Sequence, residues 1–309
     1  MTLDEINALR TKHYNATVVS IRFANPDLMI IRVKPDAGVA KHRPGQYSTL
    51  GLGHWEVRAP DCQEENPKAG DEVKLIRRAY SISSSVLNDA GDLYAETSRE
   101  WLEFYIVLVR QADKAAPALT PRLFTLKSGD RVFLGEKIAG HFTLETVKPT
   151  DNIVFLSTGT GEAPHNYMLW ELLNNSHDGR ILSACCVRFK QDLGYLSIHE
   201  DLARRYPNYA YASLTTREAT TVNQKVYIQD LITSGQLEER LGAKLDPACT
   251  HVYLCGNPKM IGVPNIDKTT GKFVFPQPLG LIEILTQRGF QMDQPSVKLK
   301  GNVHLEEYW

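Results

Sequence analysis

Apolar and polar residues alternate in short runs through the first half of the chain, and turn-forming residues separate the runs. Alternation with a period of two is typical of strands that bury one face, and closely spaced short strands predict an antiparallel barrel or sandwich. One helix is inserted, with Thr120 as its N-cap and Pro121 at its first position, where a missing N–H is harmless. The predicted strands are residues 16–24, 28–34, 46–53, 77–85, 103–110 and 131–135.

The second half has a different pattern, in which buried apolar runs alternate with stretches of helical period. Strands that alternate with helices predict a parallel sheet covered on both faces. The pattern changes near residues 147–151, so we predict two domains, 1–148 and 149–309. The predicted strands are residues 152–157, 180–187, 209–214 and 250–255, and the predicted helices are 162–174, 197–205, 227–234 and 279–288.

Composition excludes several classes of protein. Of the 309 residues, 42% are hydrophobic and 23% are charged, and a net charge of -1 gives no field that selects nucleic acid as a partner. The five cysteines form no C-x-x-C pair, so zinc and iron–sulfur sites are not expected, and an odd number is typical of a reducing compartment. Residues 1–15 carry no apolar signal region and no run reaches the length of a membrane span, so we expect a cytoplasmic protein without stable membrane insertion.

The pair His199-Glu200 lacks the second histidine of a zincin motif. We therefore predict no metal site, and we expect this segment to be a solvent-facing helix.

The segment Ser157–Pro164 holds the most informative motif, with Gly159 and Gly161 between a predicted strand and a predicted helix. Glycine allows the backbone to approach a phosphate closely, and a helix N-terminus offers free N–H groups and the positive end of a dipole. The pattern is G-x-G-x-x-P, which matches the usual dinucleotide fingerprint only in part. A plain strand-to-helix turn is the alternative interpretation.

Basic residues follow the next strands. A typical NAD site places an acidic residue after the second strand, but here the strand ends at Arg188, which suits a phosphate instead. Thr216 and Arg217 end another strand, and Lys225 and Tyr227 follow. Together these residues are candidates for a cationic pocket with an aromatic platform for an adenosine phosphate, and the alternative is ordinary surface basic residues.

Taken together, the motifs of the chain resemble those of the ferredoxin–NADP(H) reductases, including their bacterial flavodoxin-reducing members. The resemblance implies an antiparallel β-barrel FAD domain followed by a parallel-sheet α/β NADP-binding domain. Any one matching block is weak evidence for the resemblance. The blocks occur in the family's order and spacing over nearly the whole chain, which makes a chance match improbable. The blocks are Arg78-Ala79-Tyr80-Ser81, Glu103–Arg110, Leu119–Leu123, Gly140–Leu144, Thr158–Pro164, Val187-Arg188, Asp192–Leu196, Thr216-Arg217-Glu218, Cys255-Gly256-Asn257-Pro258 and Glu306-Glu307-Tyr308-Trp309.

The resemblance assigns FAD contacts to the first half. Arg78 would pair with the FAD pyrophosphate through its guanidinium fork, Tyr80 would lie on one face of the isoalloxazine, and Ser81 would hydrogen-bond near N5. Without the other blocks, Tyr80 would be an ordinary core aromatic. The further implied FAD residues are Ala79, Tyr105, the main chain around Val107 and Val109, Thr120 and Thr143.

For NADP(H), the resemblance implies that Arg217 and Lys225 grip the 2′-phosphate and that Tyr227 stacks on adenine. Arg188 is a further phosphate candidate, and Thr216 stands where many members carry serine. The residues implied for the pyrophosphate region and the nicotinamide side are Thr158, Gly159, Thr160, Gly161, Gly256 and Asn257.

The implied reaction centre is at the end of the chain. Cys255 would lie near nicotinamide C4, although a cysteine ending a buried strand is more often core. Tyr308 would stack over the other flavin face, and Trp309 extends past it. Glu306 is a candidate for proton relay, and Glu307 is the adjacent alternative.

The implied function is ferredoxin (or flavodoxin)–NADP(H) reductase: hydride exchange between NADPH C4 and FAD N5, then single-electron transfer to the carrier protein. The alternatives are the reductase component of an oxygenase, a flavin or quinone reductase, and a non-catalytic flavin-binding sensor. The sequence departs from the family at Glu162, which is charged where many members have a small or apolar residue, and in residues 263–278 and 293–300.

Overall fold

The computed structural model describes residues 1–95, 100–294 and 298–308. The chain divides into two compact units, Met1–His141 and Phe142–Trp309. The units therefore meet a few residues before the predicted boundary at 148/149, and the assignment of domains to 1–148 and 149–309 stays a prediction.

The first unit is built on one antiparallel sheet in the order β4-β3-β6-β1-β2-β5. A bridge between Ser83 and Glu103 joins the continuation of β4 to β5, so that the two ends of this order meet and the sheet closes as a barrel. This confirms the predicted barrel. The strands are β1 (Ala16–Asn25), β2 (Leu28–Pro35), β3 (Tyr47–Gly53), β4 (Leu75–Ser81), β5 (Leu102–Val107) and β6 (Arg131–Leu134), with helices α1 (Leu3–His13) and α2 (Thr120–Leu123).

This unit differs from the prediction in some strand ends and in one additional helix. Strand β4 ends at Ser81, before the predicted end at residue 85. Strand β5 ends at Val107, because the Leu108 amide donates to Asp27 and the Val109 amide donates to the Thr120 hydroxyl rather than to a neighbouring strand. Helix α1 was not predicted. It buries no residue and is held at its start by a capping box between Thr2 and Glu5.

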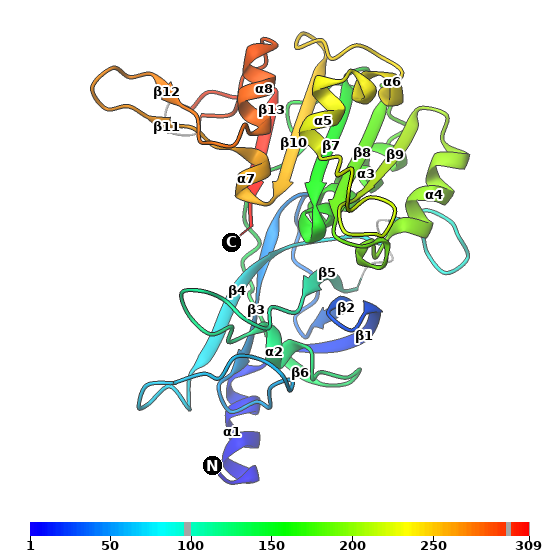
Figure 1. Cartoon of the computed structure of the whole chain (residues 1–309). Helices are drawn as coiled ribbons and strands as arrows, with labels where there is room; N and C mark the ends of the chain where they lie inside the picture. The colour runs from blue at the N-terminus through cyan, green and yellow to red at the C-terminus, as the bar shows by residue number, and fades with distance from the viewer. Residues whose placement is uncertain (96–99, 295–297, 309) are drawn as a thin grey trace. The chain divides into compact units, whose positions relative to one another are not determined.

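The second unit is a parallel sheet in the order β13-β10-β7-β8-β9 with helices packed along it (Figure 1), as predicted. Strand β8 is buried at every position, as expected for a sheet covered on both faces. The strands are β7 (Asn152–Thr158), β8 (Ile181–Val187), β9 (Tyr209–Thr215), β10 (Thr250–Gly256) and β13 (Val303–Glu307). The helices are α3 (Glu162–Asn174), α4 (Leu196–Arg205), α5 (Ile228–Thr233), α6 (Gln236–Leu241), α7 (Pro258–Ile261) and α8 (Leu281–Gln287).

One face of this sheet packs against α5, α6 and α8 through aliphatic residues such as Val154, Leu182 and Leu254. The excursion at 263–278 holds a short antiparallel pair, β11 (Asn265–Ile266) and β12 (Phe273–Val274). Across the described ranges, no helix combines the length and the apolar character needed to cross a membrane.

Candidate active site

The parallel sheet has its switch point between β7 and β10. The chain proceeds from β7 to β8 and β9 on one side, then returns to β10 and β13 on the other side. In open α/β sheets, ligands bind in the crevice at the carboxyl ends of the strands where this reversal occurs. Strands β7 and β10 end at Thr158 and Gly256 respectively, so these ends mark the expected site.

Two glycines let the segments after β7 and β10 approach each other closely. A Cβ on Gly161 would lie 2.3 Å from the Cys255 carbonyl oxygen, and a Cβ on Gly256 would lie 2.4 Å from the Thr158 hydroxyl. The Asn257 amide also donates to that hydroxyl at 2.8 Å. The structure therefore brings together the residues predicted for the dinucleotide: Thr158, Gly159, Thr160, Gly161, Gly256 and Asn257.

The loop leads into a helix whose N-terminus carries a charge. Residues Gly159–Gly161 form a single 3-10 turn, and Glu162 begins α3. A carboxylate at that position is stabilised by the helix dipole. The Glu162 carboxylate does not face solvent: it is buried, it accepts a hydrogen bond from the Tyr211 hydroxyl at 2.8 Å, and it lies 3.2 Å from His199 Nε2.

The predicted helix is present and Glu200 on it is exposed, but the expectation that His199 faces solvent was wrong. His199 is fully buried, its ring stacks on Tyr211 with centroids 4.2 Å apart, and its Nδ1 lies 2.7 Å from the Tyr209 hydroxyl. The residue lies on the inner stripe of α4 together with Leu202. The spacing of His199 and Leu202 is the sequence signal that would have indicated burial. Within the described part of the chain, no group of three or more His, Cys, Asp or Glu is arranged to hold a metal.

The predicted basic residues lie at the neighbouring strand ends. The Arg217 amide donates to the Arg188 carbonyl at 2.8 Å, and the Thr216 amide donates to Val187 at 3.1 Å. The ends of β8 and β9 thus hold the Arg188 and Arg217 backbones side by side, with both side chains exposed. Lys225 and Tyr227 are exposed on the segment that enters α5, where the Tyr227 amide donates to Asp230.

The predicted reaction-centre residues share two paired strands. Cys255 lies opposite Glu306, and Gly256 lies opposite Glu307, in the β10–β13 register. The Tyr308 amide donates to the Gly256 carbonyl at 2.9 Å. Trp309 lies outside the described residues.

Burial raises the pKa of the Cys255 thiol well above its ordinary value, the charge of Glu306 raises it further, and a hydrogen bond with Tyr308 acts in the opposite direction. The thiol is therefore protonated near neutral pH and is not a nucleophile. Partial burial raises the pKa of Glu307.

In the first unit, β4 carries Arg78, Ala79, Tyr80 and Ser81. Successive side chains alternate across a strand, so Arg78 and Tyr80 share one face and Ser81 is buried on the other. The Tyr80 ring meets Phe104 edge-on at 6.5 Å between centroids, and burial raises the pKa of its hydroxyl.

The other predicted FAD residues differ in burial and in the unit to which they belong. Tyr105 is buried on β5, and the Val107 side chain at the end of that strand is exposed. Thr143 belongs to the second compact unit, where its carbonyl accepts a hydrogen bond from the Tyr253 hydroxyl at 3.1 Å.

Thr120 is not the N-cap of α2, contrary to the prediction. The cap position is Leu119, without a side-chain hydrogen bond, and Thr120 is the first helical residue. Its hydroxyl instead accepts the Val109 amide at 3.2 Å, which ties the helix start to the segment after β5. A residue's preference for the cap position was outweighed here by this non-local contact.

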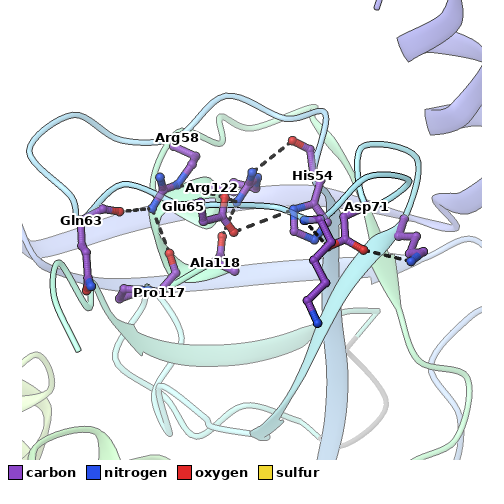
Figure 2. Close-up of polar contacts among 10 residues, drawn as sticks. His54, Arg58, Gln63, Glu65, Asp71, Pro117, Ala118 and Arg122 are labelled. Carbon is purple, nitrogen blue, oxygen red and sulfur yellow. Dashed lines mark hydrogen bonds and ion pairs between the residues drawn. The ribbon is translucent and has the colours of Figure 1, made fainter. Parts of the chain in front are cut away.

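A buried ion cluster holds α2 to the long connection between β3 and β4, and Figure 2 shows its members converging on Glu65. Glu65 Oε2 lies 2.7 Å from Arg122 and 3.5 Å from Arg58, and Oε1 lies 3.8 Å from His54. Arg122 is only 4% exposed and also donates to the carbonyls of Ala118 and His54. The sequence showed only a polar insertion here, because nothing in it pairs Glu65 with residues so distant along the chain.

We expect Glu65→Gln to lower the free energy of unfolding by about 3 kcal/mol, because it leaves the buried Arg122 guanidinium without its counter-charge. Urea unfolding of the variant measures this change. The matched control is Glu64→Gln, since Glu64 is exposed. Equal unfolding midpoints for the two variants would show that the cluster contributes nothing to stability.

Comparison with known proteins identifies the class. The family model described as the oxidoreductase NAD-binding domain matches residues 155–264, which include the switch-point loop. A barrel unit followed by a doubly wound unit with this loop defines a two-domain oxidoreductase.

Two relatives show which family of oxidoreductases the chain belongs to. The flavodoxin/ferredoxin–NADP reductase of Escherichia coli (strain K12) is 31% identical over 197 residues, which cover 63% of this chain and 73% of that relative. The reductase of the same name from Buchnera aphidicola subsp. Schizaphis graminum is 27% identical over 298 residues, covering 96% of this chain and 98% of that relative. The chain belongs to the flavodoxin/ferredoxin–NADP reductase family. In fold it is similar to a solved ferredoxin NADP+ reductase from Neisseria gonorrhoeae with bound FAD and NADP, with a TM-score of 0.65, 21% identity, and coverage of 95% of this chain and 97% of that one.

Proposed function

We propose that the chain is an FAD-dependent ferredoxin (or flavodoxin)–NADP(H) reductase. It exchanges hydride between NADPH C4 and FAD N5 and then passes electrons singly to the carrier protein. The observation that carries this proposal is the glycine-closed loop at the switch point, with Arg188 and Arg217 held together at the adjacent strand ends. The names of the bacterial relatives support the reaction and the carrier.

The second unit fits NADP(H). A Cβ on Gly159 would meet nothing within 4 Å, so the backbone of this loop is open to a pyrophosphate, which Thr158, Gly159, Thr160 and Gly161 would bind. Arg217 and Lys225 bind the 2′-phosphate, with Arg188 as a further cation. Tyr227, an exposed ring, stacks on the adenine.

The first unit fits FAD. Arg78 is exposed on the same face of β4 as Tyr80, so a guanidinium and an aromatic ring are available to one ligand. Arg78 binds the pyrophosphate, Tyr80 stacks on the ring system, and Ser81 and Thr143 orient it. When bound, FAD accepts hydride at N5 and releases electrons one at a time.

At the reaction centre, Cys255 shapes the nicotinamide position as a protonated thiol rather than as a nucleophile, which follows from its raised pKa. Glu306 or its neighbour Glu307 relays a proton at its carboxylate. Tyr308 covers the flavin until nicotinamide replaces it.

Carrier-dependent turnover tests the proposal against its rivals. The FAD-loaded protein is supplied with NADPH and with ferredoxin, flavodoxin, free flavin or a quinone in separate assays. We expect the highest kcat/KM with ferredoxin or flavodoxin. Turnover with free flavin or quinone alone would make the chain a flavin or quinone reductase, and no flavin reduction at all would make it a sensor.

We expect Tyr308→Ser to raise kcat/KM for NADH by roughly tenfold. The tyrosine ring would compete with nicotinamide for the same place over the flavin, and its removal takes away a stacking interaction of about 1.4 kcal/mol. The visible flavin spectrum should change on coenzyme binding. Steady-state kinetics with both coenzymes measures the selectivity, and an unchanged spectrum with unchanged selectivity would remove Tyr308 from the flavin.

A further inference from the structure

Four buried or half-buried titratable groups form a continuous chain of polar contacts, two hydrogen bonds and one ion pair, along the edge of the parallel sheet. The Asp293 carboxylate lies 2.7 Å from His304 Nδ1, His304 Nε2 lies 3.0 Å from His251 Nδ1, and His251 Nε2 lies 3.4 Å from Asp151 Oδ2. We name these residues the histidine chain. Neither the family blocks nor the proposed reaction uses any of them.

The rings are held in fixed positions by stacking. The His251 and His304 rings are nearly parallel, with centroids 5.3 Å apart and an interplanar angle of 9°. The Tyr253 ring stacks on His304 at 4.4 Å. His304 is 4% exposed, so water does not replace its partners. The two imidazoles therefore cannot turn away from each other without unpacking this part of the sheet.

Counting protons shows what the histidine chain needs. Its three contacts (Asp293 to His304, His304 to His251, and His251 to Asp151) each need one N–H. Two neutral imidazoles carry only two N–H groups, and two imidazolium rings carry four, which would place two N–H groups against each other. All three contacts are satisfied when the pair of rings holds one extra proton.

The surroundings disfavour that proton on His251. Burial and then the positive charge of His304 lower the pKa of His251. Burial alone would raise the pKa of Asp293, but the hydrogen bond from His304 and its charge hold that pKa below its ordinary value. The other charged or titratable groups facing the chain are Lys300 beside Asp293, and Tyr253 with Glu171 behind it.

The histidine chain lies on the same strands as the predicted reaction centre. Tyr253 pairs with His304 and Cys255 pairs with Glu306 in the β10–β13 register. Side chains two apart on a strand share a face, so His304 and Glu306 lie on one face of β13, and Tyr308 follows directly after the strand. Because β13 lies at the edge of the five-stranded sheet, with β10 as its neighbour there, the contacts of His304 are an additional restraint on its position.

We propose that the histidine chain is a positioning device that fixes β13, and with it Glu306 and Tyr308, through a single proton shared by His304 and His251. The consequence for coenzyme use rests on the proposed function. Release of the proton as pH rises leaves two N–H groups for three contacts, and one contact is lost. Addition of a second proton as pH falls charges His251 against His304.

Acid pH weakens the histidine chain. His251 has a folded-state pKa below its unfolded value of about 6.5, so its contribution to stability is present above that pH and is lost as pH falls. Asp293 also has a lowered pKa, and its contribution is lost only at more acidic pH, below its unfolded value of about 3.9. We therefore expect stability to fall on the acid side, where His251 gains a proton, and on the alkaline side, where the shared proton is released.

Histidine-selective nitrogen NMR of the FAD-loaded protein reads the proton directly, and His251→Gln and His304→Gln assign the two signals. Near about pH 7 we expect three N–H protons on the two rings together, with His251 neutral and its proton on Nε2. Two neutral rings at this pH, or two rings that titrate independently near about 6.5, would overturn the shared proton. This result does not depend on any turnover, so it stands or fails separately from the proposed function.

Positioning is tested with Asp293→Asn, which keeps the shape and removes the charge, against the control Asp178→Asn at an exposed site in the same unit. We expect faster hydrogen exchange of the amides of residues 303–307 in Asp293→Asn only. We also expect the alkaline limb of the NADPH-dependent pH profile to move down by about one unit or more, since the carboxylate no longer stabilises the imidazolium. Unchanged exchange and an unchanged profile would overturn the positioning role.

Discussion

We expect the Arg217→Ala variant to show a KM for NADPH raised roughly 30-fold, while its KM for NADH changes little. A charge-assisted hydrogen bond to a phosphate contributes about 2 kcal/mol, and each 1.4 kcal/mol is a factor of ten. Arg217 is exposed just after β9, and its amide donates to the Arg188 carbonyl, so it lies beside Arg188 at the proposed 2′-phosphate site. NADH lacks that phosphate, so removing the Arg217 side chain removes no contact with it.

The matched control is Arg240→Ala, since Arg240 is an exposed arginine on α6 of the same unit. Arg217→Lys should give an intermediate KM for NADPH, because lysine keeps the charge and lacks the planar fork. Steady-state kinetics with both coenzymes measures all three variants. Equal effects on NADPH and NADH would remove Arg217 from the 2′-phosphate site.

We expect Gly161→Ala to destabilise the protein by about 3 kcal/mol and to weaken NADPH binding by about 100-fold or more. The added Cβ would lie 2.3 Å from the Cys255 carbonyl oxygen and 2.9 Å from the Gly256 amide nitrogen. These are backbone atoms of β10 and cannot rotate away as a flexible side chain would. The loop after β7 must therefore move off β10, and the nucleotide site opens with it.

The matched control is Gly159→Ala in the same loop. Gly159 has a positive φ of 53°, and a Cβ there meets nothing within 4 Å, so the cost is local backbone strain of about 1 to 2 kcal/mol. Urea unfolding and NADPH titration compare the two variants. If both alanines have the same effect, close packing of Gly161 on β10 is not what shapes the site.

The parts of the fold that depend on local pattern were predictable. The buried run of β8 and the Gly159–Gly161 turn before α3 have local signals in the sequence, namely a continuous apolar stretch and glycines between a strand and a helix. The location of the site at the ends of the parallel strands follows from the same pattern. Helix α1 had no such signal, because it buries nothing and its capping box is its only mark.

The remaining features depend on pairs that are distant in the sequence. Glu65 with Arg122, Glu162 with His199, and His251 with His304 each join different elements, and no local period indicates which polar residues will be buried together. The same reason explains the error at Thr120, where a contact with Val109 replaced the expected cap. Candidate site residues could thus be named from the sequence only where a motif marks them, and the buried polar networks were recognised only in the structure.

The central claim is that NADPH reduces a flavin held by this chain, and an anaerobic titration of the purified FAD-loaded protein with NADPH tests it most directly. The account predicts that the yellow absorbance of the flavin bleaches with about one NADPH per FAD, because one hydride carries two electrons, and that oxidised ferredoxin or flavodoxin restores it. A preparation that cannot be loaded with FAD, or a bound flavin that NADPH leaves oxidised, would contradict it.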